Sequence, residues 1–134
     1  SGCVRRLLLI SLLLCASLLA HATGATGATR AAEVRILVQS SPLAGFQYHA
    51  GESLWPQLRE GDALSLIREV DNAHDANAVR VEWRGQKLGY LPRKENGAVA
   101  AAMDGGERVA ARIARLREHR NPWQRLLIEV FVVL

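Results

Sequence analysis

Short polar side chains gather in residues 71–77, which read Asp-Asn-Ala-His-Asp-Ala-Asn. The oxygen atoms of Asp and Asn accept hydrogen bonds from nearby backbone N–H groups, so this polar loop can hold a tight turn. The same atoms can accept a hydrogen bond from a ligand hydroxyl. Asp75 therefore has two roles open to it, as an acceptor for a ligand and as an Asx-turn toward Asn77. His74 is either an exposed loop residue or a ligand partner through stacking or hydrogen bonding.

The polar loop leads into segments that can position it. Apolar and polar side chains alternate over residues 79–83, which predicts a half-buried strand with Trp83 facing the interior. Arg84-Gly85 predicts a two-residue hairpin turn, and residues 86–91 predict the returning strand, which Pro92 ends. A rigid hairpin beside a loop can present binding side chains in a fixed arrangement.

The other elements complete a mostly β chain with two short helices. Helices are predicted from Gly51 onward and over residues 94–104. Further strands are predicted at residues 33–39, 63–69, 108–117 and 126–134. In the first of these strands we expect the alternating residues Val34, Ile36 and Val38 to face inward. The last strand is apolar almost throughout, as the closing strand of a barrel would be, so we expect a small OB-like or SH3-like β-barrel.

The sequence lacks the patterns of an enzyme or a metal site. Ser53 and Ser65 have no motif around them that would make a nucleophile. The chain has no Gly-x-x-x-x-Gly-Lys-Ser/Thr loop and no paired cysteines at zinc spacing. His49, His74 and Asp75 are metal-ligand types, but nothing in their spacing brings them together. We therefore expect no catalysis, no metal and no cofactor.

The first 22 residues have the features of a secretory signal peptide. Arg5 and Arg6 precede a run of 14 apolar residues at 7–20, and residues 20–22 form an Ala-x-Ala cleavage signal. The run is shorter than the ~20 residues of a membrane-spanning helix. A lipoprotein modified at Cys15 is the alternative. We expect cleavage after residue 22, a flexible leader at residues 23–32, a domain at residues 33–134 with no membrane span, and a periplasmic or secreted product.

Cleavage would change the charge and the cysteine content. Both cysteines, Cys3 and Cys15, lie in the predicted signal peptide, so the mature domain would contain no disulfide. Without Arg5 and Arg6 the 17 basic residues become 15 against 13 acidic ones, a net charge of +2. This charge excludes a protein that coats nucleic acid through electrostatics alone.

Five short motifs in a fixed order give the chain a family resemblance. They are residues 45–51 (Gly-Phe-Gln-Tyr-His-Ala-Gly), 61–69 (Gly-Asp-Ala-Leu-Ser-Leu-Ile-Arg-Glu), 71–79, 88–92 (Leu-Gly-Tyr-Leu-Pro) and 95–96 (Glu-Asn). In this order and spacing the chain resembles the HIRAN domain family over residues 34–133. The resemblance implies an OB-like barrel with two short helices. It also implies binding of single-stranded DNA with capture of a free 3′-hydroxyl end.

The resemblance assigns roles to particular residues. Tyr48 would stack on the terminal base, and Asp75 would accept the hydrogen bond of the 3′-hydroxyl. Arg93 and Lys94 would approach phosphates. The chain departs from the family at two pocket positions, where a second aromatic residue is His74 and a basic residue is Gln47. These departures remove one large π-face and one positive charge.

Two functions of different classes therefore remain open. The first is a nucleic-acid binding module that captures a single-stranded DNA 3′ end. The second is a periplasmic or secreted module that binds a protein or glycan with the same pocket. The matched pocket favours the first and the predicted export favours the second. Tyr48 and Phe46 have the same parity, and we expect Phe46 in the core and Tyr48 in the pocket.

Overall fold

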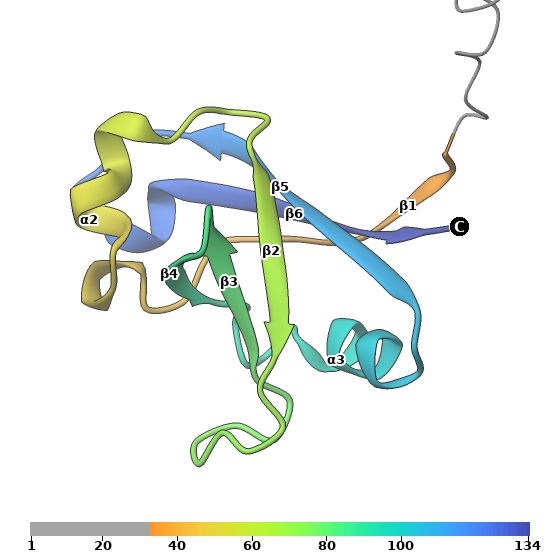
Figure 1. Cartoon of the computed structure of the whole chain (residues 1–134). Helices are drawn as coiled ribbons and strands as arrows, with labels where there is room; N and C mark the ends of the chain where they lie inside the picture. Colours follow the sequence, from red (N-terminus) through yellow and green to blue (C-terminus); the bar gives the residue numbers. More distant parts are fainter. Residues whose placement is uncertain (1–32) are drawn as a thin grey trace, which may run out of the picture. The chain divides into compact units, whose positions relative to one another are not determined.

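The protein is built around one sheet of six antiparallel strands, which a computed structural model describes for residues 33–134 (Figure 1). The strand order is β1-β6-β5-β2-β3-β4. The strands are β1 (Arg35–Ser41), β2 (Ala63–Arg68), β3 (Val79–Trp83), β4 (Gln86–Tyr90), β5 (Arg108–Leu116) and β6 (Leu126–Val133). The helices are α2 (Gly51–Leu54) and α3 (Gly97–Asp104), with 3-10 turns at Phe46–Tyr48, Trp55–Gln57 and Pro122–Gln124. The predicted signal peptide and leader, residues 1–32, lie outside the described residues.

Local sequence features produce the predicted elements. The mostly β chain with two short helices is confirmed. Arg84 and Gly85 form the tight hairpin turn with φ values of 47° and 78°, the left-handed pair that a two-residue connection requires. The pairing of β5 with β6 carries a shift of register between Ile113 and Arg115. Helix α3 ends at Asp104, and the N–H of the next residue, Gly105, donates to the Ala101 carbonyl.

The sheet does not close into a barrel through strand pairing, so the predicted barrel is not confirmed. β1 and β4 are its two edges, and β6 lies between β1 and β5 instead of closing the sheet. A single antiparallel bridge joins the segment after β1 to β4, with Ala44 and Tyr90 exchanging backbone hydrogen bonds of 2.8 and 2.9 Å. Pro42 follows β1 and Pro92 follows β4, and neither can donate a ladder hydrogen bond. Gly89 permits the bridge, because a Cβ there would collide with the Ala44 carbonyl oxygen.

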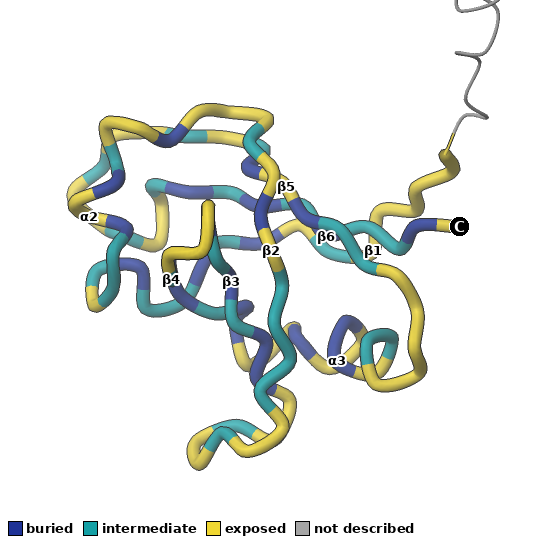
Figure 2. The backbone as a smooth tube through the Cα atoms, viewed as in Figure 1, coloured by how far each residue is buried: buried dark blue, intermediate teal, exposed yellow. Residues whose placement is uncertain are grey.

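The inward orientation that we expected for the first strand is wrong. Val34, Ile36 and Val38 are 58%, 48% and 41% exposed, and Leu37 between them is also exposed. An edge strand pairs on one side only, and the register of β1 with β6 shifts between Leu37 and Gln39. Its first half therefore lies outside the core (Figure 2). Alternation in the sequence correctly indicated a strand, but the position of that strand at the edge of the sheet determined its exposure.

The core is formed by side chains from β2 to β6, from the segment after β1 and from both helices. Val79, Val81 and Trp83 all face it, as predicted, and each is at most 3% exposed. The Trp83 indole also donates to Asp62 Oδ2 at 3.0 Å, which anchors β3 to the turn before β2. The other large buried side chains include Leu43, Phe46, Leu54, Leu58, Leu88, Leu91, Val99, Ile113, Ile128 and Val130. Neither helix of residues 33–134 has the length and hydropathy needed to cross a bilayer.

Candidate functional site

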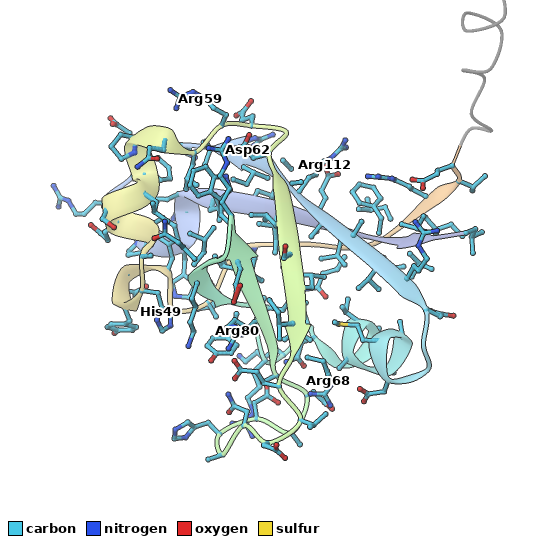
Figure 3. The ribbon with its side chains drawn as sticks, in the orientation of Figure 1. His49, Arg59, Asp62, Arg68, Arg80 and Arg112 are labelled. Carbon is cyan, nitrogen blue, oxygen red and sulfur yellow. The ribbon has the colours of Figure 1, made fainter. Side chains whose placement is uncertain are left out.

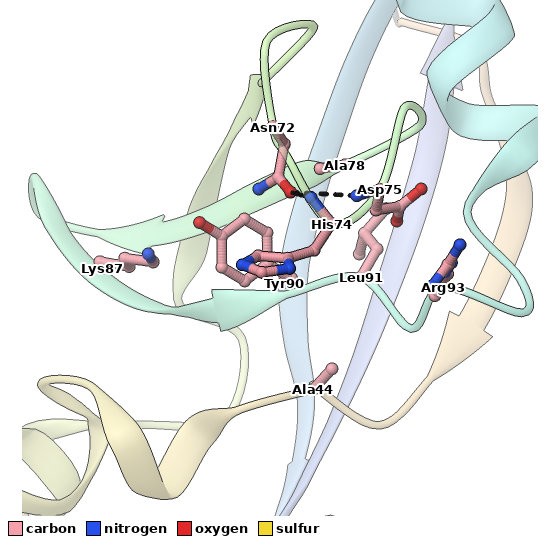
Figure 4. Close-up of a pocket in the computed structure, with 9 residues that line it drawn as sticks. All are labelled: Ala44, Asn72, His74, Asp75, Ala78, Lys87, Tyr90, Leu91 and Arg93. Atoms are coloured by element: carbon pink, nitrogen blue, oxygen red, sulfur yellow. Dashed lines mark hydrogen bonds between the residues drawn. The ribbon is translucent and has the colours of Figure 1, made fainter.

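A cavity of about 460 Å³ opens beside the polar loop. Its walls come from that loop, from the end of β4 and from the segment that follows β1 (Figure 4). The lining residues are Ala44, Asn72, His74, Asp75, Ala78, Lys87, Tyr90, Leu91 and Arg93. The volume falls within the ~300–1,000 Å³ that is usual for small-ligand sites.

Side-chain hydrogen bonds fix the polar loop from within. Asn72 Oδ1 accepts from the backbone N–H groups of His74 at 2.9 Å and Asp75 at 3.1 Å. Asp75 Oδ1 accepts from the Asn77 N–H at 2.9 Å, so the Asx-turn considered for Asp75 is present. This bracing role leaves other lone pairs of the carboxylate available, because two oxygens offer about four acceptor positions.

Two neighbouring residues hold the loop from outside. The Arg68 guanidinium donates to the carbonyls of Ala76 at 2.7 Å and Ala78 at 3.1 Å, and it pairs with Asp104 on α3 (Figure 3). Glu69 donates its backbone N–H to the Ala78 carbonyl at 2.9 Å. The loop is therefore tied at its base to the end of β2 and, through Arg68, to α3.

Asn96 fixes the carboxylate of Asp75 from behind the cavity. Its Nδ2 donates to Asp75 Oδ2 at 2.7 Å. The Asn96 side chain is only 1% exposed, and its Oδ1 is buried with no hydrogen-bond partner. A fully buried amide that makes one such bond keeps the carboxylate in one position.

Tyr90 supplies an aromatic wall of the cavity. Its hydroxyl donates to Glu69 Oε1 at 3.0 Å, and the Lys87 ammonium lies 4.4 Å from the ring centroid. The His49 ring meets it edge to face with 6.1 Å between centroids. Burial, assisted by the Lys87 charge, lowers the pKa of His49 below its ordinary 6.5. The imidazole is therefore neutral near pH 7, and Lys87 and Arg93 carry the positive charge at the cavity.

Glu69 receives hydrogen bonds from several directions. Besides the Tyr90 hydroxyl, its carboxylate accepts from Asn72 Nδ2 at 3.0 Å and Arg80 Nη1 at 2.9 Å. The Asn72 hydrogen bond is the main cause that lowers the pKa of Glu69 below its ordinary 4.5, against an opposing effect of burial. The Tyr90 hydroxyl and the charges of Arg80 and Lys87 lower this pKa further. The carboxylate is therefore ionised near neutral pH.

The structure brings together some of the site residues expected from the sequence. His74, Asp75 and Arg93 line the cavity. Lys94 lines an adjacent hollow that shares Ala44 and Arg93 with it. The roles assigned to these residues stay predictions.

Tyr48 and Gln47 do not line this cavity. Tyr48 is 78% exposed on a 3-10 turn that packs against β4, whereas Phe46 is fully buried, as expected. The stacking role of Tyr48 also stays a prediction.

Sequence reasoning missed Tyr90, Lys87, Glu69 and Asn96 as parts of the site. Tyr90 and Asn96 stood within recognised motifs, yet only their contacts give them a place at the cavity. Alternation along β4 would place Tyr90 on the buried face of Leu88, two residues away. The register shift in the pairing of β3 with β4 changes this, and no signal in the sequence shows that shift. No group of three His, Cys, Asp or Glu side chains within residues 33–134 is placed to hold a metal ion.

Comparisons with known proteins agree with the sequence motifs. The HIRAN domain family model matches residues 36–134. A crystal structure of a Lactobacillus plantarum protein is similar with a TM-score of 0.65 and 27% identity, over 76% of this chain and 98% of that chain. The crystal structure of the HIRAN domain of human HLTF shares the fold with a TM-score of 0.55 and 23% identity, over 72% of this chain and 78% of that chain.

A curated plant protein is also similar. The Fanconi-associated nuclease 1 homolog of Oryza sativa subsp. japonica is 33% identical over an alignment of 72 residues, which covers 51% of this chain and 7% of the rice protein. The chain therefore spans a small part of that relative's length. The family model, in contrast, matches nearly all of the residues that the structure describes. The chain belongs to the HIRAN domain family.

Proposed function

We propose that this protein is a DNA-binding module whose cavity holds the 3′ end of a single strand with a free hydroxyl. The observation that carries the proposal is the convergence of an aromatic ring, two cations and a fixed carboxylate in one cavity of a HIRAN domain. A relative of this domain is named a nuclease, which is a class of enzyme that acts on nucleic acid.

Each part of the cavity suits one part of a strand end. The ring of Tyr90 offers a face for a base, and stacking on an aromatic ring contributes about 1–3 kcal/mol per base. Lys87 and Arg93 supply positive charge for a phosphate. The carboxylate of Asp75 accepts a hydrogen bond from a sugar hydroxyl, whereas it repels a terminal phosphate. The exposed ring of Tyr48 offers a second stacking surface next to β4.

The test compares two versions of one short single strand, ending in a 3′-hydroxyl or a 3′-phosphate. Fluorescence anisotropy at fixed salt measures the binding of both to the wild-type protein. We expect tighter binding of the 3′-hydroxyl strand. Asp75→Asn should remove this preference, because an amide no longer repels the phosphate. Asp71→Asn is the matched control, since Asp71 is an exposed carboxylate of the same loop that does not line the cavity.

Other variants separate stacking from charge. Tyr90→Leu should weaken both strands alike, because stacking does not distinguish the terminal group. Arg93→Gln should also weaken both, and it should reduce the slope of log affinity against log salt by about 1. Arg84→Gln, on the exposed hairpin turn, should leave that slope unchanged.

Two outcomes would overturn the proposal. Absence of binding to either strand at tens of micromolar, a range typical of weak non-specific DNA binding, would leave the protein- or glycan-binding alternative as the better hypothesis. Equal binding of both strands would show that Asp75 serves only as the loop brace.

A further inference from the structure

We propose that Glu69 is the positioning residue of the cavity, because its one carboxylate holds both the polar loop and the Tyr90 ring in place. The inference deepens the proposed function, since it names the group that sets the geometry of that site. Glu69 does not line the cavity itself.

The link to the loop runs through Asn72. Glu69 Oε1 accepts from Asn72 Nδ2 at 3.0 Å, and this bond orients the amide so that Oδ1 points the other way. That Oδ1 accepts the backbone N–H groups of His74 and Asp75. The Glu69 carboxylate thus determines the orientation of the amide that shapes the backbone at both cavity residues.

The link to β4 runs through the Tyr90 hydroxyl. This hydroxyl lies 3.0 Å from Oε1 and 3.3 Å from Oε2 of Glu69, so rotation of the ring would break the hydrogen bond. The same carboxylate is held from β3 by Arg80 at 2.9 Å. The ring and the loop come from different elements, and among the described residues Glu69 is the side chain that hydrogen-bonds to both Asn72 and Tyr90.

Ionisation is required for this arrangement. Arg80 and Lys87 are the cationic groups that act on Glu69 from β3 and β4, and Asn72 and Tyr90 donate to it from the loop and β4. An ionised carboxylate accepts from all three donors at once. A glutamine has one acceptor oxygen, whereas Asn72 and Tyr90 donate to Oε1 and Arg80 donates to Oε2. The amide oxygen should face Arg80, because the guanidinium can only donate and the Tyr90 hydroxyl can accept from the NH₂ group instead. Glu69→Gln therefore leaves the Asn72 NH₂ group without an acceptor and tests the proposal with little change in shape.

Glu82→Gln is the matched control. Glu82 also pairs with Arg80, through Nε at 2.9 Å, and its side chain is 18% exposed compared with 21% for Glu69. The two variants remove the same charge and one ion pair with the same arginine. Asn72 and Tyr90 have hydrogen bonds to Glu69 and none to Glu82 among the bonds of the described residues.

The first readout needs no ligand. Amide hydrogen exchange measured by NMR should become about tenfold faster at His74 and Asp75 in Glu69→Gln, the loss expected for a hydrogen-bond network to a charged group. Exchange at Val81 and Ile113 in the core should not change, and Glu82→Gln should behave as wild type throughout. In an Asn72→Ala background, Glu69→Gln should add no further change at His74 and Asp75, because the link is already broken.

The second readout is binding of the 3′-hydroxyl and 3′-phosphate strands. Glu69→Gln should reduce the preference for the 3′-hydroxyl strand, and Glu82→Gln should preserve that preference. Glu69→Asp should not restore it, because the shorter side chain cannot reach Asn72 and Tyr90 together. If exchange at Val81 and Ile113 became faster by the same factor as exchange at His74 and Asp75, the variant would have lost stability throughout and the proposal would be overturned. Unchanged exchange at His74 and Asp75 would also overturn it. If wild type binds no DNA but the exchange results hold, the proposed function fails and the positioning role of Glu69 stands.

Discussion

The contact between Asp75 and Asn96 predicts that two substitutions of Asp75 differ widely in stability. Asp75→Ala removes the acceptor of the Asn96 Nδ2 group, which is buried with an Oδ1 that already lacks a partner. It also removes the Asx-turn to Asn77. An unsatisfied buried donor and a lost turn bond together cost about 2–4 kcal/mol. A domain of this size has a total stability of roughly 5–10 kcal/mol, so the loss is severe.

Asp75→Asn should be tolerated for a specific reason. The new oxygen can keep the bond from Asn77, and the new NH₂ group can donate to Asn96 if the Asn96 amide turns over. That turn exchanges its nitrogen and oxygen atoms, so the hydrogen bond between the two side chains is kept and one buried amide atom stays without a partner, as in the native protein. The expected change in the free energy of unfolding is below about 1 kcal/mol.

Thermal unfolding followed by circular dichroism measures both variants. Asp75→Ala should lower the Tm by about 10–20 °C and Asp75→Asn by a few degrees at most. In an Asn96→Ala background the difference between the two substitutions should shrink to that of the lost Asx-turn bond, about 1 kcal/mol, because the buried amide is gone. Equal loss of stability for both variants in the native background would refute the turn-over of the amide. An Asp75→Ala protein as stable as wild type would refute the contact itself.

Four further predictions address the core, the pH dependence and the N-terminus. Trp83→Ala should cost about 3–5 kcal/mol and remove most of the cooperative unfolding transition, and a Tm within a few degrees of wild type would contradict the burial of this side chain. Folding lowers the pKa of His49, so as pH drops the unfolded chain takes up the proton before the folded chain does. The free energy of unfolding should therefore fall as pH drops below 6.5, and His49→Gln should flatten that part of a curve of this free energy against pH. Folding also lowers the pKa of Glu69, so its ionised carboxylate adds to the free energy of unfolding above pH 4.5, and this contribution is lost as pH falls through the folded-state pKa. Glu69→Gln should abolish that loss, measured in the same curve. We also propose that residues 1–22 are cleaved on export, which intact-mass measurement of the exported protein would show, and a product that retains residues 7–20 would rule it out.

Several parts of the candidate site could be predicted from the sequence because they depend on nearby residues. The Asx-turn at Asp75 closes on Asn77, two residues away, and the hairpin turn requires only the left-handed pair Arg84 and Gly85. The buried face of β3 follows from alternation over five residues. Interactions of this range are determined by side-chain type and period alone.

The remaining parts depended on packing between distant segments. Asn96 reaches Asp75, and Tyr90 reaches Glu69, across 21 residues in each case. Alternation indicates which residues share a face, but it does not show which segment packs against that face or at what register. The family resemblance pointed to Tyr48, which is exposed, and only the structure shows that Tyr90 forms an aromatic wall of the cavity.

The first strand shows the same division. The sequence by itself determined that residues near 35–41 form a strand, because their side chains alternate and are β-branched or aliphatic. Only the tertiary structure decided that this strand lies at an edge of the sheet with Ile36 and Val38 exposed. It also decided that a single bridge joins the two edges of the sheet, beside Pro42 and Pro92. The physical reason is that strand formation is a property of local backbone and side-chain shape, whereas burial is a property of the neighbours that the sheet order supplies.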